Sequence, residues 1–180
     1  MAGTIEISTE RLLLRKHIPS DAEVLYELAG KDESMYRYSG WNPYETQEMA
    51  EETVRRFIAS YDDPLFFGWG IEHEGKLIGT IGAYDYDRAS KSIEAGFSIF
   101  CPYQGHGFAS EALKAVIDYL LSRDEIETVT AWCASENPAS ARTMEKAGMR
   151  LKKIVRGDLH VGEKTYDRMV YACSNEERKW

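Results

Sequence analysis

The fold is decided in the stretch Tyr103-Gln104-Gly105-His106-Gly107-Phe108-Ala109-Ser110-Glu111-Ala112-Leu113, where two glycines separate an expected strand from an expected helix. Upstream, residues 93–100 are rich in aromatic and branched side chains and stop at Cys101-Pro102, which predicts a strand. Downstream, apolar residues recur at three- and four-residue spacing, which predicts a helix from about Phe108 to Ser122. The turn between them presents unpaired helix-initial N–H groups and suits an anion such as a diphosphate. An ordinary strand-to-helix turn explains two glycines equally well.

Two better-known phosphate loops do not match this stretch. A dinucleotide-binding fingerprint requires a third Gly or Ala three residues after Gly107, where this chain has Ser110. The nucleoside triphosphate loop requires the sequence Gly-Lys-Ser/Thr, which the chain lacks. Both classes of nucleotide-binding protein are therefore excluded.

A second turn signal lies at Asn137-Pro138, because Asn is a favoured helix cap and Pro a favoured first helical residue. Gly148 is expected to end this helix, so Ser140 belongs to its first turn. The helix follows an expected strand at residues 127–133. Since a long helix connects that strand to the 93–100 strand, we expect the two strands to be parallel neighbours with their turns side by side. A plain capped helix is the simpler interpretation of the spacing alone.

The remaining patterns also alternate between helix and strand. Ser20 begins a capping-box pattern that predicts a short helix carrying Val24, Leu25 and Leu28. The other expected elements are a first strand at 11–15, a helix at about 46–60, a hairpin of 66–72 with 76–86, and a final antiparallel pair of 151–155 with 167–173. Together they predict a mixed sheet flanked by helices.

Composition limits the class of protein. A chain of 180 residues with 43% hydrophobic content can form one sizeable core, so we expect a single domain over residues 1–180 with its core at about 8–174. Neither a membrane-spanning run nor a secretion signal is recognisable, which favours a cytoplasmic protein without a membrane partner. Three widely spaced cysteines indicate no disulfide framework and no zinc site. A formal charge of −8 argues against a nucleic-acid partner.

The motif Gln-x-x-Gly-x-Ala at residues 104–109 resembles the acetyl-CoA pyrophosphate loop of the GNAT superfamily of N-acetyltransferases. The resemblance also includes residues 9–15, 77–82, 136–140 and 166–167, nearly the whole chain, and is strongest to the branch of Rim-type ribosomal-protein N-terminal acetyltransferases. It implies an α/β (α+β) GNAT fold: a central, mixed, mostly antiparallel sheet of about six to seven strands with a splayed parallel pair, flanked by about four helices. The function it implies is acetyl transfer from acetyl-CoA directly to a primary amine.

The same resemblance implies a set of cofactor-binding residues. Acetyl-CoA is the expected co-substrate, and no metal is expected. Pantetheine is expected along the backbone of Phe97, Ser98 and Ile99, and the thiol end beside Asn137 and Ser140. The pyrophosphate is expected on the loop formed by Gln104, Gly105, His106, Gly107, Phe108 and Ala109, with Gln104 bracing it.

Amine acetylation needs a neutral nucleophile and a proton for the departing thiolate. Glu94 is the first candidate for the base, and Asp158 the second; an exposed charge explains each of them equally well. Many GNAT enzymes have a tyrosine as the acid at the position of Met144 here, so the resemblance to Rim-type members assigns Ser140 to the CoA sulfur. Tyr166 is another possible proton donor.

The acceptor is the least determined part. The resemblance favours a protein or peptide N-terminal α-amine, with a small-molecule acceptor (polyamine or antibiotic) and a non-catalytic acyl-CoA sensor as alternatives. Aromatic residues at Tyr36, Tyr38, Trp41 and Trp69 form an expected acceptor wall, with Tyr36 and Trp41 the primary candidates, although core packing explains such aromatics more simply. The chain is expected to be a monomer or homodimer.

Overall fold

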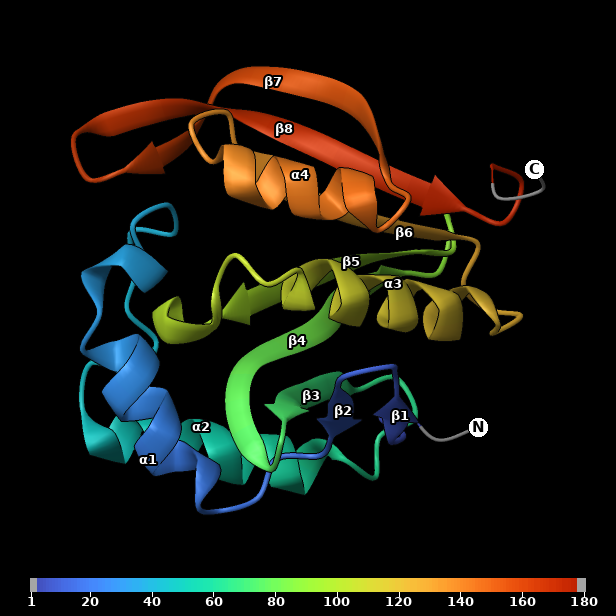
Figure 1. The fold of residues 1–180 in the computed structure, drawn as a ribbon. Coiled ribbons are helices and arrows are strands. Elements are labelled where there is room, and N and C mark those ends of the chain that lie inside the picture. Colours follow the sequence, from blue (N-terminus) through green and yellow to red (C-terminus); the bar gives the residue numbers. More distant parts are fainter. Residues whose placement is uncertain (1–2, 178–180) are drawn as a thin grey trace.

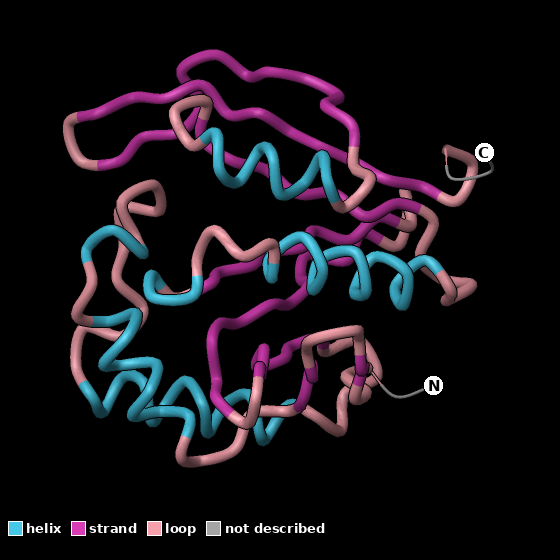
Figure 2. The backbone as a smooth tube through the Cα atoms, viewed as in Figure 1, coloured by secondary structure: helices cyan, strands magenta, loops and turns pink. Residues whose placement is uncertain are grey.

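The computed structural model describes residues 3–177 and contains one eight-stranded sheet in the order β1-β2-β3-β4-β5-β6-β8-β7 (Figures 1 and 2). Every neighbouring pair is antiparallel except β5 with β6. The strands are β1 (Ile7–Ser8), β2 (Leu13–Arg15), β3 (Phe67–His73), β4 (Lys76–Asp87), β5 (Ser92–Ile99), β6 (Thr128–Ala134), β7 (Arg150–Val161) and β8 (Lys164–Ser174). The predicted mixed sheet with one parallel pair is confirmed.

Within residues 3–177, four α-helices and three short helical turns accompany the sheet. The α-helices are α1 (Asp21–Leu25), α2 (Gln47–Ser60), α3 (Phe108–Leu121) and α4 (Pro138–Lys146), and the turns are η1 (Tyr26–Gly30), η2 (Glu33–Met35) and η3 (Cys101–Tyr103). None of the helices within residues 3–177 is long and apolar enough to span a bilayer.

Two details differ from the sequence-based expectation. The sheet has eight strands rather than six or seven, because the two-residue β1 pairs with β2 at the sheet edge. The predicted capping box at Ser20 is wrong: the Ser20 side chain forms no cap hydrogen bond, and its backbone is helical rather than extended. Instead, the carboxylate of Asp21 accepts the N–H of Ile18 at 3.1 Å.

The parallel strands separate soon after they meet. β5 pairs with β6 only from Ser92 opposite Thr128 to Glu94 opposite Thr130, although both strands continue beyond this point. Figure 1 shows the two strands diverging, with α3 and α4 side by side on one face of the sheet. An opening therefore forms between β5 and β6, and each of the two helices begins beside it.

The core lies mainly between α3 and the sheet. The buried side of α3 includes Leu113, Val116 and Leu120, all fully buried, at the three- and four-residue spacing that predicted the helix. A second apolar cluster joins α1 and α2 to the sheet through Leu77 and Phe100. Leaving these apolar side chains in water would cost about 1.5 to 3 kcal/mol each, so the two clusters hold the opening in place.

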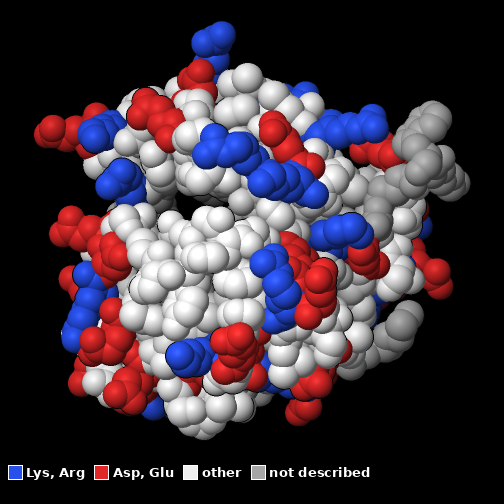
Figure 3. Space-filling model, in the orientation of Figure 1, with Lys and Arg blue, Asp and Glu red and all other residues white. Residues whose placement is uncertain are grey.

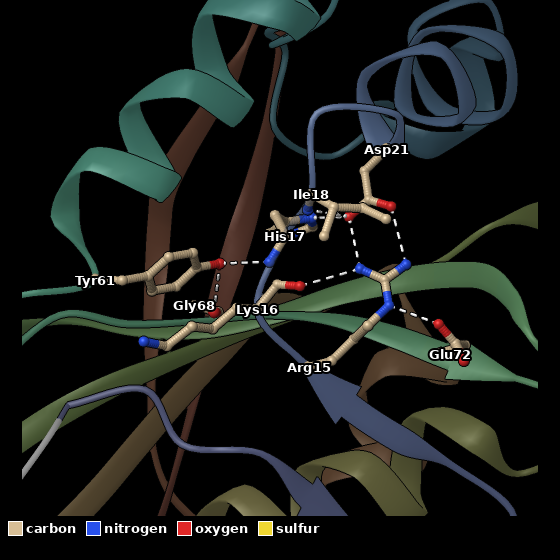
Figure 4. A network of polar contacts seen from close by, with 8 residues as sticks. All are labelled: Arg15, Lys16, His17, Ile18, Asp21, Tyr61, Gly68 and Glu72. Carbon is tan, nitrogen blue, oxygen red and sulfur yellow. Dashed lines mark hydrogen bonds and ion pairs between the residues drawn. The ribbon is translucent and has the colours of Figure 1, made fainter.

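A buried polar network joins β2 to the start of α1 (Figure 4). Asp21 accepts hydrogen bonds from both terminal nitrogens of Arg15, at 2.8 and 2.9 Å, and contacts Nδ1 of His17 at 2.9 Å. Arg15 Nε also donates to Glu72 of β3 at 2.6 Å, and the His17 N–H donates to the Tyr61 hydroxyl at 2.7 Å. Burial opposes ionisation of Asp21, but the hydrogen bonds from His17 and Arg15 outweigh it and hold its pKa well below the usual range.

Candidate active site

A cleft of 610 Å³ opens where β5 and β6 diverge. Its walls are the end of β5, residues 103–105 and 107–110 at the start of α3, one side of α4, and residues 34, 35 and 37–39 between η1 and α2. His106, predicted to bind the cofactor, does not line the cleft. Figure 3 shows the hollow between the upper and lower halves of this face, with Lys and Arg side chains along its upper rim. The two turns predicted to lie side by side therefore share one cleft.

The glycines of the 103–109 loop are required by its backbone conformation. Gly105 and Gly107 have φ angles of 81° and 82°, in the left-handed region that residues with a Cβ atom adopt at a cost. Gly107 is the N-cap residue of α3, and no side chain caps this helix. The first N–H groups of α3 therefore face the cleft side of the loop without an intrahelical acceptor, as an anion site requires.

The loop is braced from both ends. Gln104 Nε2 donates to the carbonyl of Ile99 at 2.8 Å, so Gln104 has the bracing contact expected of it. Arg11, from the segment before β2, donates to the carbonyl of His106 at 3.0 Å and pairs with Glu111 at 2.7 Å. Thr9 also donates to Glu111, at 2.6 Å. These hydrogen bonds from Thr9 and Arg11 overcome the effect of burial and lower the pKa of Glu111.

The second turn has the predicted cap. Asn137 Oδ1 accepts the N–H of Ser140 at 3.2 Å, Pro138 is the first residue of α4, and Gly148 follows the helix with a φ of 92°. Ser140 lies in the first turn and lines the cleft together with Asn137. Met144 is fully buried in the core and does not line the cleft.

Glu94 does not line this cleft but lies at the last paired position before the strands diverge. Its neighbours Ile93 and Ala95 are buried in the core with α3, so alternation along β5 places Glu94 on the opposite face of the sheet. There its carboxylate accepts a hydrogen bond from Nε1 of Trp132 at 2.8 Å. Burial and the nearby negative charge of Glu94 raise the pKa of Tyr84, whose ring lies over Gly96.

Asp158 lies on β7, two positions beyond β6 in the strand order. It is exposed on β7 and forms an ion pair with Arg168 of β8 at 2.6 Å. The Arg168 guanidinium lies 5.8 Å from the centre of the Trp132 ring. Trp132 therefore stands between the two predicted carboxylates, with Glu94 hydrogen-bonded to it and Asp158 reaching it only through Arg168.

The four aromatic residues predicted to form an acceptor wall are not brought together. Tyr38 lines the cleft, and its hydroxyl donates to the carbonyl of Glu136 at 2.7 Å. Trp41 is 65% exposed and lines a separate shallow groove, and Tyr36 lines neither hollow. Trp69 is fully buried in the core, so its assignment to an acceptor wall is wrong; alternation along β3 turns it toward α3. Tyr166 is also buried and meets the edge of Tyr38 at 5.7 Å.

Three cations in the cleft were missed by the sequence reasoning. Arg142 and Lys146 line it from α4, and Arg37 lines it from the opposite side. The signal was the spacing of Arg142 and Lys146, which are four residues apart on one helix and therefore share a face. Among the described residues that line the cleft, none is Asp or Glu.

A metal centre has no support in the described part of the chain. Residues 3–177 contain no group of three or more His, Cys, Asp or Glu side chains that could hold a metal ion. Within the described residues, Cys101, Cys133 and Cys173 form no disulfide, and burial raises the pKa of Cys133 to about 11.

Comparison with known proteins agrees with this geometry. A family model described as acetyltransferase (GNAT) domain matches residues 11–150. The uncharacterised N-acetyltransferase YoaA of Bacillus subtilis (strain 168) is 31% identical over 168 residues, covering 92% of this chain and 94% of YoaA. A ribosomal-protein-serine acetyltransferase of Escherichia coli (strain K12) is 25% identical over 174 residues, covering 96% of this chain and 97% of that protein.

The fold agrees with a solved structure as well. The ribosomal α-N-protein acetyltransferase RimL, in complex with coenzyme A, superimposes with a TM-score of 0.85 at 20% sequence identity, covering 94% of this chain and 98% of that chain. The fold and the cleft define an acyltransferase built around a splayed pair of strands. The chain belongs to the GNAT acetyltransferase family, and it is an N-acetyltransferase.

Proposed function

We propose that this enzyme transfers acetyl from acetyl-CoA directly to the α-amine of a peptide or protein N-terminus. The observation that carries the proposal is the position of the opening between β5 and β6: the glycine loop and the capped turn of α4 lie on one side, and the carboxylate of Glu94 lies on the other face of the sheet. A donor thioester in the cleft and an acceptor amine beside Glu94 would meet at this opening.

The donor is assigned to the cleft residues. Pantetheine would pair with the backbone of Phe97, Ser98 and Ile99, which β6 no longer reaches after Glu94. The pyrophosphate would lie on the amides from Gly105 to Ala109, with Gln104 holding the loop. His106 is exposed on this loop and stacks on Phe108 at 5.6 Å, so it would remain at the solvent side of the phosphates.

The acetyl group would then lie between the starts of α3 and α4. Ser140 lines the cleft at this end, and its backbone N–H donates to Oδ1 of Asn137. A serine hydroxyl is too weak an acid to protonate a thiolate rapidly by itself, so we assign Ser140 to stabilising the departing sulfur and orienting a water. No cysteine is among the described residues that line the cleft, which is consistent with direct transfer rather than an acyl-enzyme.

The amine needs only a weak base. With a reference pKa of about 8, an α-amine is roughly one-tenth neutral at pH 7, whereas lysine, near 10.4, is neutral about once in a few thousand molecules. Glu94, held by Trp132 at the vertex of the opening, can take the proton through a water. Asp158 is the weaker candidate because it is already paired with Arg168.

The acceptor peptide is assigned first to Tyr38, which lines the cleft where the 34–39 segment meets the turn before α4. Trp41 lies in the separate groove, so only a longer acceptor chain would extend to it. The similarity to a ribosomal-protein-serine acetyltransferase supports a protein acceptor.

A screen of thiol release tests the proposal. Acetyl-CoA is supplied with peptides of different N-terminal residue, with the same peptides blocked at the N-terminus but carrying an internal lysine, with spermidine, and with an aminoglycoside. Release with free N-termini and not with the blocked controls is the expected result. Preference for spermidine or the aminoglycoside would favour a small-molecule enzyme, and binding without transfer a sensor. Failure to bind acetyl-CoA in calorimetry would refute all three.

A further inference from the structure

We propose that Arg142 and Lys146 of α4 form a site for the ribose phosphomonoester of coenzyme A, so that this enzyme discriminates CoA from dephospho-CoA. The inference rests on the proposed function, because it requires a CoA thioester as the donor. This site is distinct from the pyrophosphate loop: it binds the ribose phosphate rather than the pyrophosphate, and it lies on α4 rather than at the start of α3.

The two side chains lie on one face of α4. Ala139, Arg142, Thr143 and Lys146 all line the cleft, which is the spacing of a single helical stripe. Four residues correspond to a rise of about 6 Å along the axis, so the two cationic groups can approach one phosphate together. Both residues are exposed, and neither has an ion-pair partner within the part of the chain that the structure describes.

The charge of the cleft differs from that of the whole molecule. The chain carries a formal charge of −8, yet the described lining of the cleft holds Arg37, Arg142 and Lys146 and no carboxylate. Figure 3 shows Lys and Arg side chains along the upper rim of the hollow. Cations without neighbouring carboxylates favour an anionic ligand, and the planar guanidinium of Arg142 can bind a phosphate through two hydrogen bonds.

The arrangement of α3 and α4 assigns a different phosphate group of CoA to each helix. α3 and α4 run side by side away from the opening in Figures 1 and 2. The start of α3 offers uncapped N–H groups to the pyrophosphate, and a nucleotide leaving that loop passes the later turns of α4. Arg37 belongs to the same wall as Tyr38, which we assign to the acceptor, so it serves as the matched comparison rather than as part of this site.

The test is calorimetric titration with CoA and with dephospho-CoA. Wild-type protein is compared with Arg142→Gln, Lys146→Gln, Arg37→Gln and Lys114→Gln. Lys114 is an exposed cation of α3 that pairs with Asp118 and does not line the cleft. We expect wild type to bind CoA at least about tenfold more tightly than dephospho-CoA, because a charged hydrogen bond to phosphate is worth about that factor.

Arg142→Gln should weaken CoA binding about tenfold and leave dephospho-CoA binding unchanged, so that the ratio of the two Kd values approaches one. Lys146→Gln should likewise bring the ratio of the two Kd values closer to one. Because Lys146 also ends α4, where a cation favours the helix dipole, thermal melting is measured alongside to separate folding from binding. Arg37→Gln and Lys114→Gln should leave the ratio unchanged.

Three outcomes would overturn the inference: equal binding of the two ligands by wild type, an equal loss for both ligands in Arg142→Gln, or a changed ratio only in Arg37→Gln. Each leaves the proposed function intact, because CoA still binds. If wild type binds neither ligand, the proposed function fails as well.

Discussion

The two sides of the cleft are built differently. The proposed donor side consists of the 103–109 loop and the first turn of α4. Gln104 and Arg11 donate hydrogen bonds to backbone carbonyls there, and Asn137 Oδ1 accepts a backbone N–H. The proposed acceptor side, residues 34–39, is joined to the turn before α4 by the Tyr38 hydroxyl, and Tyr38 packs on Tyr166. The donor is the same for every reaction of such an enzyme, so backbone recognition suffices there. The acceptor side uses side chains, which can differ without changing the fold.

The proposed acceptor side is connected to the sheet through α1. α1 and η1 lead directly into residues 34–39, and the buried network of Arg15, His17 and Asp21 anchors α1 to the sheet. Four substitutions test this contrast between the two sides, and they are ordered by the size of the expected effect.

The largest effect is expected from Asp21→Asn. Removing the buried carboxylate leaves Arg15 without its main partner, so the free energy of unfolding should fall by about 3 kcal/mol in urea titrations. The folded-state pKa of Asp21 is depressed, so its contribution is complete above the unfolded pKa of about 3.9 and is lost as the pH falls below it. The gap between wild type and variant should therefore narrow below about pH 4.

The matched control is Glu27→Gln in η1, which removes a surface ion pair with Lys31. Its urea midpoint should match wild type. An equal midpoint for Asp21→Asn would show that the network does not anchor α1.

Glu94→Gln comes next, and it tests whether the face opposite the donor cleft carries the chemistry. The value of kcat/KM for a peptide acceptor should fall roughly 100-fold, as for loss of a general base. The Kd of acetyl-CoA should not change, because Glu94 does not line the cleft. Asp158→Asn is the comparison and should have a smaller effect on turnover. Wild-type turnover in Glu94→Gln together with a large loss in Asp158→Asn would reverse the assignment.

Gly107→Ala should weaken acetyl-CoA binding about tenfold. A φ of 82° costs an L-residue roughly 1 to 2 kcal/mol, which the loop can relieve only by moving its amides. Gly148→Ala is the control, since Gly148 has a φ of 92° but does not line the cleft. In thermal melting, Gly148→Ala should be destabilised as much as Gly107→Ala, but its affinity for acetyl-CoA should equal that of wild type. Equal affinity in both variants would mean that the loop amides do not bind the donor.

The smallest effect is expected from Tyr38→Phe, which removes the hydroxyl that donates to the Glu136 carbonyl. Loss of about 1 kcal/mol should raise KM for the acceptor peptide roughly fivefold. Steady-state kinetics at saturating acetyl-CoA measures this change. If the Kd of acetyl-CoA rises by the same factor instead, the 34–39 segment belongs to the donor side.

Much of the donor side could be predicted because its signals are local. Gly107 takes a left-handed φ, Asn137 accepts the N–H of Ser140 three residues later, and the apolar period of α3 appears within one segment. Each property depends on neighbours within about four residues, which a single sequence displays. The failed capping box at Ser20 shows the limit, since Asp21 is drawn instead into hydrogen bonds with Arg15 and His17.

Local sequence therefore specified the strand, the glycine turn, the helix and the resemblance that identifies the donor. Only the packed structure showed that Trp69 is buried, that Trp41 lies in a separate groove, and that Arg142 joins Lys146 on the wall of the cleft. The pairing of Arg11 with Glu111 and of Trp132 with Glu94 likewise joins residues far apart in the chain. Turn conformations and helix caps follow from short-range sterics and hydrogen bonds, whereas the facing of side chains across a site depends on strand register and helix packing.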